Sequence, residues 1–251
     1  MDWLNQYAWI GALLFARLGA VMMIAPGWGE QTTPAMMRLG VAVLVTATLA
    51  PTLAGNAPPL PADIIGAIPM VITEVIIGLI LGLGARLMMS ALQVAGATVG
   101  LASGLGFAQQ VDPIASQPAA IFSGFFSMMG VVLIMSAGLH RVMIEAAADS
   151  YILFPPGAFP PVGDALTFVV DAVSNSFRLG IQIAAPVLIF SLVFNVALGL
   201  ISRLIPQVQV FMTAMPLSVM LGLAVTALGL GGGMMVWLQE MDRQMHILTI
   251  R

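Results

Sequence analysis

Long apolar runs alternate with short polar or Pro/Gly-rich connections along the whole chain. Six hydrophobic segments can be distinguished, and each is close to or above the roughly 20 residues that a helix needs to cross a bilayer. They cover residues 8–25, 36–54, 64–103, 119–139, 175–202 and 208–238. The third and the sixth are longer than a bilayer requires. The pattern therefore predicts an all-α, membrane-associated protein with about six long apolar helices.

The connections between these segments contain the turn-forming residues, at 26–34, 55–61 and 154–163. Residues 140–154 differ from the rest, because Arg141, Glu145 and Asp149 recur at helical spacing. This spacing predicts a short amphipathic helix outside the apolar core. No internal repeat is found, so we expect a single integral membrane domain over residues 1–251, without a soluble appendage.

The first apolar segment is interpreted as a retained helix and not as a cleaved signal peptide. Asp2 stands where a signal would be basic, and Arg17 interrupts the apolar run.

The composition confines the protein to the membrane class and excludes several chemistries. Of 251 residues, 60% are hydrophobic and 8% are charged, whereas soluble domains carry about 25% charged residues. Without cysteine there is no disulfide, thiolate metal site or cysteine nucleophile. Net charge −3 gives no sign of nucleic-acid binding.

The sequence contains none of the enzymatic motifs considered. Ser103 lies in Gly-Leu-Ala-Ser-Gly, which is not a nucleophile elbow, and the two histidines form no H-E-x-x-H motif. No nucleotide-binding pattern is present. We therefore expect no enzyme, no cofactor and no metal site.

Three charged residues lie inside apolar segments, where a charge is costly: Arg17, Glu74 and Arg86. Glu74 and Arg86 are separated by about 18 Å along a helix and point about 120° apart, so they cannot pair with each other. Each charge needs a partner on another helix, on another subunit, or in water. We predict that the three are buried charges at subunit contacts without a role in transport; the alternative is a direct role in conduction.

Glycines recur at intervals of four residues, a spacing that lets membrane helices approach closely. The sets are Gly78 and Gly82, then Gly96, Gly100 and Gly104, and finally Gly229 and Gly233.

The stretch 104–118 interrupts two apolar flanks with glycine and polar residues. Pro113 has no amide hydrogen and disfavours helical geometry at Asp112, so a helix cannot continue through this point. In lipid, a broken backbone is tolerated only where protein buries it or where it lines a watery cavity. We therefore predict that this stretch belongs to a passage through an assembly. The residues singled out are Gly104, Gly106, Phe107, Gln109, Gln110, Val111, Asp112 and Pro113.

Several motifs, taken in order, resemble the FliR family of flagellar export-gate proteins and its counterpart in type III secretion injectisomes. The most specific is Gly199-Leu-Ile-Ser-Arg-Leu-Ile-Pro206-Gln207-Val-Gln-Val-Phe211, followed by Pro216-Leu217. The others are Phe15-x-Arg17 with Pro26, Glu74-x-x-x-Gly78, Phe107-Ala108 before Asp112-Pro113, and Ala185-Pro186. The resemblance covers essentially the whole chain.

The resemblance implies a FliP-like part over residues 1–174, followed by a FliQ-like helical hairpin over 175–251 that turns at 202–207. It implies an assembly with FliP- and FliQ-like subunits and a docked FlhB-like subunit, with a FlhA-like subunit and the basal-body ring as further candidates. It also implies that the mid-chain loop within 104–118 plugs the pore. The hairpin turn, with Arg203, Pro206 and Gln207, is expected to be an assembly contact.

The resulting prediction is a non-enzymatic subunit of the flagellar type III export gate in the bacterial inner membrane and the flagellar basal body. It would help form and seal a channel for unfolded flagellar proteins, in contact with membrane lipid. The alternatives are a secondary transporter of a small solute, a virulence type III secretion gate subunit, and a pure assembly scaffold. A secondary transporter normally shows inverted repeats, which are not found in this sequence.

Overall fold

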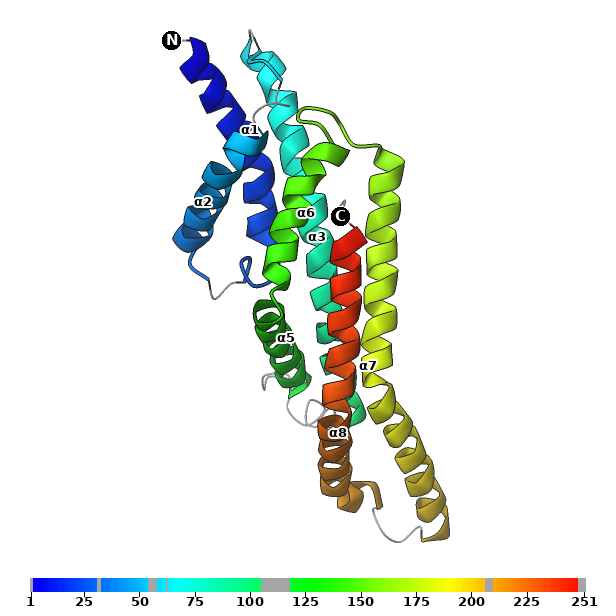
Figure 1. Ribbon diagram of the computed structural model, residues 1–251. Coiled ribbons are helices and arrows are strands. Elements are labelled where there is room, and N and C mark those ends of the chain that lie inside the picture. Colours follow the sequence, from blue (N-terminus) through cyan, green and yellow to red (C-terminus); the bar gives the residue numbers. More distant parts are fainter. Residues whose placement is uncertain are drawn as a thin grey trace. The chain divides into compact units, whose positions relative to one another are not determined.

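The computed structural model describes residues 2–30, 33–53, 58–61, 63–104, 118–205 and 210–247. Every regular element in these ranges is an α-helix, which confirms the all-α prediction. The helices are α1 (Asp2–Ile24), α2 (Ala35–Leu53), α3 (Ile64–Ala102), α5 (Pro118–Ser136), α6 (Leu139–Leu153), α7 (Val162–Leu204) and α8 (Val210–Ile247) (Figure 1).

The described helices agree with the predicted number of membrane segments. Five of them, α1, α2, α3, α7 and α8, are long and apolar enough to cross a membrane. The pair α5 and α6 makes a sixth if it counts as one span bent by 73°. Gly138, with φ 78°, lies at this bend. At 39 and 43 residues, α3 and α7 are about 58 and 65 Å long, well beyond a hydrocarbon core of about 30 Å.

Two predicted boundaries were wrong because the helices extend beyond the predicted apolar segments. Helix α7 begins at Val162 and not at 175. Its first turns pack through Phe168, whose ring lies so close to Gly84 that a Cβ there would meet Phe168 Cζ at 2.6 Å. Helix α8 continues past 238 to Ile247, and Met241 and Met245 bury one face of this polar extension.

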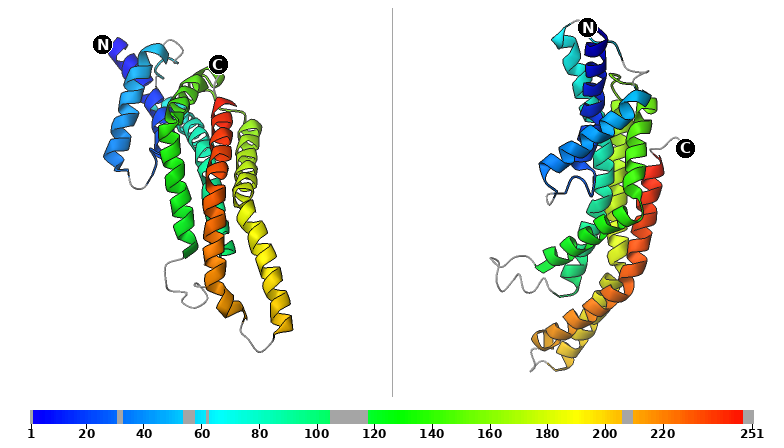
Figure 2. Two further views of the ribbon diagram at one scale, coloured as in Figure 1. Left: turned by 60° about the horizontal axis from the view of Figure 1, so that its bottom comes forward. Right: turned by 60° about the vertical axis from the view of Figure 1, so that its left-hand side comes forward.

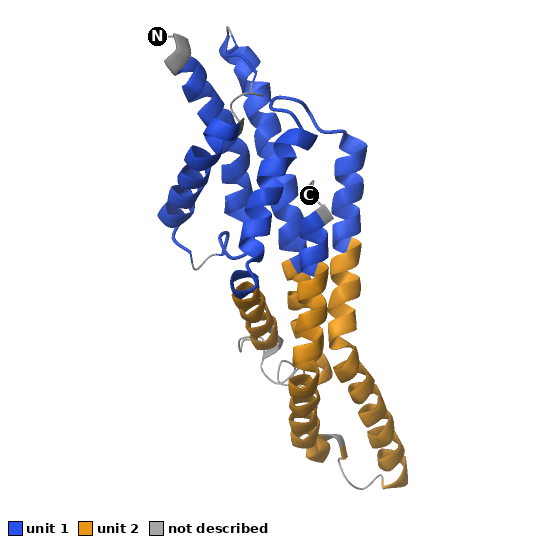
Figure 3. Cartoon of the chain, viewed as in Figure 1, with its two compact units in different colours: residues 1–88, 134–173, 241–251 blue, residues 89–133, 174–240 orange. Residues whose placement is uncertain are grey.

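The chain divides into two compact units, shown in Figure 3. Unit 1 comprises residues 1–88, 134–173 and 241–251, and unit 2 comprises residues 89–133 and 174–240. This division reflects which residues are in contact in space and not their order along the chain. The division at 174 and 175 into FliP-like and FliQ-like parts stays a prediction.

In unit 1, α1 and α2 form an antiparallel helical hairpin (Figures 1 and 2). Helix α1 also packs tightly on α3, as the glycine spacing predicted. A Cβ at Gly78 would lie 2.8 Å from the Cβ of Ala20, and one at Gly82 would lie 3.2 Å from Val21 O. Side chains at these glycines would push the two helices apart.

In unit 2, the described parts of α7 and α8 run antiparallel to each other (Figures 1 and 2). Ile183 of α7 packs on Gly233 of α8, where a Cβ would lie 3.0 Å from Ile183 Cγ2. Gly96 of α3 approaches α5 even more closely, since a Cβ there would meet the Cα of Ser123 at 2.6 Å. The close approach predicted from glycine spacing is therefore confirmed at Gly96 and Gly233.

Candidate functional site

Arg17 and Glu74 form a buried ion pair in unit 1. Arg17 lies on α1 and Glu74 on α3, and both side chains are 0% exposed. Arg17 Nε donates to Glu74 Oε2 at 2.7 Å and Nη2 donates to Oε1 at 3.1 Å. This two-pronged geometry is the strongest that an arginine and a carboxylate can make. The partner that the sequence analysis left open is thus another helix of the same chain.

The remaining N–H groups of Arg17 donate hydrogen bonds to oxygen atoms at the C-terminal end of α6. Nη1 donates to the carbonyl oxygen of Ser150 at 3.0 Å and to its hydroxyl at 3.1 Å, and Nη2 donates to the carbonyl oxygen of Phe154 at 3.0 Å. The last carbonyls of a helix lack partners within the helix, and a cation at this end is favoured by the helix dipole. All five N–H groups of Arg17 therefore have acceptors.

Two further contacts extend this arginine cluster, which consists of Arg17, Glu74, Ser150, Tyr151 and the Phe154 carbonyl. The Arg17 guanidinium lies 4.0 Å from the centre of the Tyr151 ring, a cation–π contact. Gly157, with φ 81°, donates its backbone N–H to Glu74 Oε1 at 2.9 Å. The cluster thus joins α1, α3, α6 and the connection after α6. Because its polar groups bond to one another, the cluster holds these elements together.

Arg86, the third charge, pairs with Glu30 in the connection between α1 and α2. Its Nη1 lies 2.5 Å from Glu30 Oε1, and the side chains are 35% and 26% exposed. Glu30 was not predicted as this partner, because it lies outside the apolar segments. Arg17 and Glu74 would have to separate before either could touch a neighbouring subunit directly. A subunit contact at Arg17, at Glu74 or at the more exposed Arg86 stays a prediction.

Helix α3 ends where the predicted interruption at 104–118 begins. Gly104 adopts φ 86°, a left-handed conformation that only glycine adopts without strain and that commonly ends helices. Its N–H donates to the carbonyl oxygen of Leu101 at 3.2 Å. The next described helix, α5, begins at Pro118. The other predicted loop residues, Gly106, Phe107, Gln109, Gln110, Val111, Asp112 and Pro113, lie outside the described residues.

The predicted hairpin turn begins later than expected. Helix α7 continues through Ser202 and Arg203 to Leu204, so these two residues belong to its last turn. The Ser202 hydroxyl donates to the carbonyl oxygen of Gly199 at 2.9 Å, and the exposed Arg203 places its charge at the favourable end of the helix dipole. Pro206 and Gln207 lie outside the described residues.

In the described ranges no three His, Cys, Asp or Glu side chains gather closely enough to hold a metal ion.

Comparison with known proteins identifies relatives along almost the whole chain. The family described as bacterial export proteins, family 1, matches residues 8–244. The flagellar biosynthetic protein FliR of Caulobacter vibrioides is 42% identical over 241 residues, which cover 96% of each chain. FliR of Escherichia coli is 30% identical over 227 residues, 90% of this chain and 85% of that one. The surface presentation of antigens protein SpaR of Salmonella typhimurium is 27% identical over 216 residues, 85% and 79% of the two chains.

Proposed function

We propose that this chain helps form and seal an export channel. It belongs to the FliR family of bacterial export proteins and is a membrane subunit of the flagellar type III export apparatus. The transported molecules would be unfolded flagellar proteins. We propose that the chain catalyses no reaction and that another part of the apparatus supplies the energy for transport.

The observation that carries the sealing role is the break between α3 and α5. Gly104 follows α3 in a left-handed conformation that turns the chain out of this apolar helix, and the next described helix, α5, begins at Pro118. An interruption between apolar segments is tolerated in a membrane assembly where protein buries it or where it borders a watery passage. This supports a plug within 104–118. A channel wide enough for a bare helix, about 10–12 Å, would leak ions unless something closed it.

The rest of the described chain would supply a rigid frame for this plug. The arginine cluster joins three helices of unit 1 through charge-assisted hydrogen bonds. In unit 2, α3 and α5 approach closely at Gly96, on either side of the interruption in sequence. Firm anchoring of both flanks would let the plug move without disturbing the frame.

Many apolar side chains of the single chain are exposed, including Leu192, Leu200 and Leu228. We propose that neighbouring FliP- and FliQ-like subunits, together with lipid, cover part of this surface in the bacterial inner membrane. An FlhB-like subunit, a FlhA-like subunit and the basal-body ring would be further contacts.

The first test is assembly. Expressed with FliP- and FliQ-like partners, the tagged chain should co-purify as a discrete complex, and expressed alone it should be heterogeneous in detergent, because its apolar surface is uncovered. Size-exclusion chromatography and subunit staining measure both. A cell that lacks the chain should make no external flagellar filament until the gene is restored. A stable, monodisperse single chain that ignores the partners would contradict the proposal.

The hairpin turn gives a second prediction. Replacing Arg203 and Gln207 together by alanine should reduce co-purification of the FlhB-like subunit more than it reduces the yield of the core complex, because Arg203 is exposed at the end of α7 and does not support the helix core. Quantitative immunoblots of both fractions measure the ratio. Ser202→Ala is the control, since its hydroxyl bonds within α7. Unchanged recruitment and motility in the double variant would exclude this contact.

A further inference from the structure

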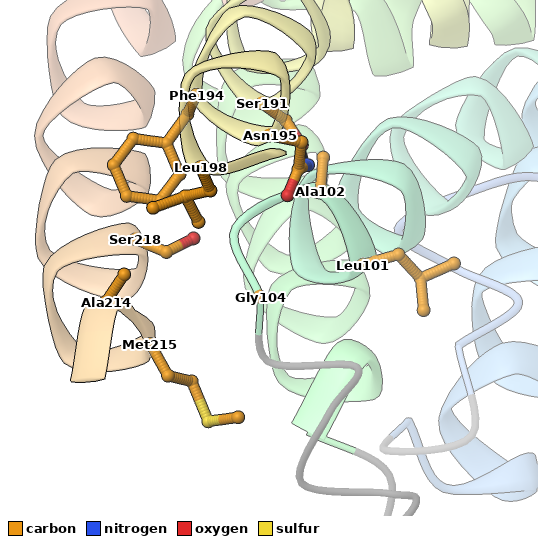
Figure 4. A pocket seen from close by; sticks show the side chains of 10 residues that line it. All are labelled: Leu101, Ala102, Gly104, Ser191, Phe194, Asn195, Leu198, Ala214, Met215 and Ser218. Carbon is orange, nitrogen blue, oxygen red and sulfur yellow. Dashed lines mark hydrogen bonds between the residues drawn. The ribbon is translucent and has the colours of Figure 1, made fainter. Parts of the chain in front are cut away.

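Unit 2 contains a concave pocket where the end of α3 meets α7 and α8 (Figure 4). Its volume is about 120 Å³, well above the roughly 10–15 Å³ that a cavity needs to hold one water. It therefore has room for a side chain. The lining residues are Leu101, Ala102, Gly104, Ser191, Phe194, Asn195, Leu198, Ala214, Met215 and Ser218.

Three polar side chains line the pocket with spare hydrogen-bonding capacity. Asn195 Nδ2 donates to Ser191 Oγ at 3.2 Å. Among the described residues, neither Asn195 Oδ1 nor the Ser218 hydroxyl has a hydrogen-bond partner. Figure 4 shows the Ser218 oxygen directed between α8 and the end of α3. By contrast, the hydroxyl of Thr226 on the same helix bonds to its own backbone, donating to Gly222 O at 2.7 Å.

The surroundings make this spare capacity costly. On α7 the neighbours of Asn195 are apolar and exposed, with Leu192, Val193 and Val196 at 67%, 64% and 57% exposure. Such a face is suited to lipid or to another apolar helix. A polar group left without a partner in that environment costs free energy, whereas Ser, Thr, Asn and Gln side chains that bond across helices hold membrane helices together.

We propose that this pocket, the Asn195 pocket, accepts a hydrogen-bonding side chain of the Ser, Thr, Asn or Gln type from a membrane helix of a neighbouring subunit. The inference rests on the proposed function, because it needs an assembled complex. A lipid tail offers neither donor nor acceptor, so it would leave Asn195 and Ser218 unsatisfied. A polar side chain on an otherwise apolar helix satisfies both and fits the volume.

The absence of cysteine from the chain allows a direct test. Ser218→Cys places one thiol in the pocket, and Ser174→Cys places one at an exposed position of α7 outside its lining. In the purified complex with its FliP- and FliQ-like partners, the rate of maleimide labelling is measured for each variant relative to the same sample unfolded in detergent. We expect labelling in the pocket to be at least tenfold slower than at position 174. Equal labelling would show an open pocket and overturn the inference.

A shortened chain distinguishes a partner from the chain's own loop. The Ser218→Cys measurement is repeated in a complex that lacks residues 106–111. Continued slow labelling supports a side chain from another subunit. Rapid labelling would assign the pocket to the loop and overturn the inference. If the unaltered chain fails to co-purify with the partners at all, the proposed function fails before the pocket is measured.

A second variant separates a polar occupant from lipid. Asn195→Leu keeps the approximate volume and removes the hydrogen bonds. We expect the complex to dissociate about three- to fifteenfold more readily in a detergent titration, the range measured for single hydrogen bonds between membrane helices. Asn175→Leu, on α7 outside the pocket, is the matched control. An Asn195→Leu complex as stable as the control would favour a lipid tail and contradict the inference.

Discussion

Replacement of Arg17 by alanine should remove most of the folded protein from the membrane. The change leaves the Glu74 carboxylate fully buried without its cation and removes the arginine donor from the Phe154 carbonyl, whereas the Ser150 carbonyl keeps its bond from the Phe154 N–H. Breaking one side of a buried ion pair typically costs about 3–5 kcal/mol, a large fraction of the about 5–15 kcal/mol by which domains are stable. The measurement is the amount of tagged protein in washed membranes, together with its resistance to unfolding on heating in mild detergent.

The controls for Arg17 separate its charge from its hydrogen-bond geometry. Arg86→Ala breaks a partly exposed pair and should cost less than about 1 kcal/mol. Arg17→Met combined with Glu74→Gln removes both buried charges and should recover part of the loss. Exchanging the two residues should not recover it, because a carboxylate at position 17 would face the carbonyls of Ser150 and Phe154. Wild-type levels of the Arg17→Ala protein would refute the structural role of the cluster.

Deletion of residues 106–111, with α3 and α5 kept, should make the membrane leaky to ions and small solutes. The flanks stay in place, because Gly96 of α3 still packs against α5 and the turn at Gly104 is kept. The complex should therefore still assemble while the apolar plug is lost. Phe107→Ala removes only one bulky side chain and should give a milder leak. Dye release from vesicles containing the purified complex, or potassium efflux from cells, measures both.

The leak must come from an assembled gate to be informative. Each variant is therefore compared at equal amounts of co-purified complex, with Phe177→Ala on the exposed face of α7 as a control for loss of an aromatic side chain. If the deletion assembles normally and the membrane stays as tight as the wild type, residues 104–118 form only a connecting turn. The plug would then be excluded while membership in the export apparatus would stand.

Much of the fold was determined by the sequence alone. Apolar runs long enough for a bilayer can satisfy their backbone there only as helices, so the helical class and the number of segments followed from composition and length. Local chemistry also marked the end of α3, because Gly104 allows the left-handed turn that closes that helix. The spacing of Gly78, Gly82 and Gly96 indicated where helices approach closely.

Tertiary structure decided which residues meet. Nothing in the sequence links Arg17 with Ser150 or Phe154, more than 130 positions away, because ion pairs depend on how helices are placed and not on spacing along one helix. Glu30 was overlooked as the partner of Arg86 for the same reason. The extensions of α7 and α8 beyond their predicted segments likewise depend on contacts, at Phe168 and Met241, that only packing supplies. Local sequence thus determined the helices and their breaks, while the three-dimensional arrangement decided how each buried charge is neutralised.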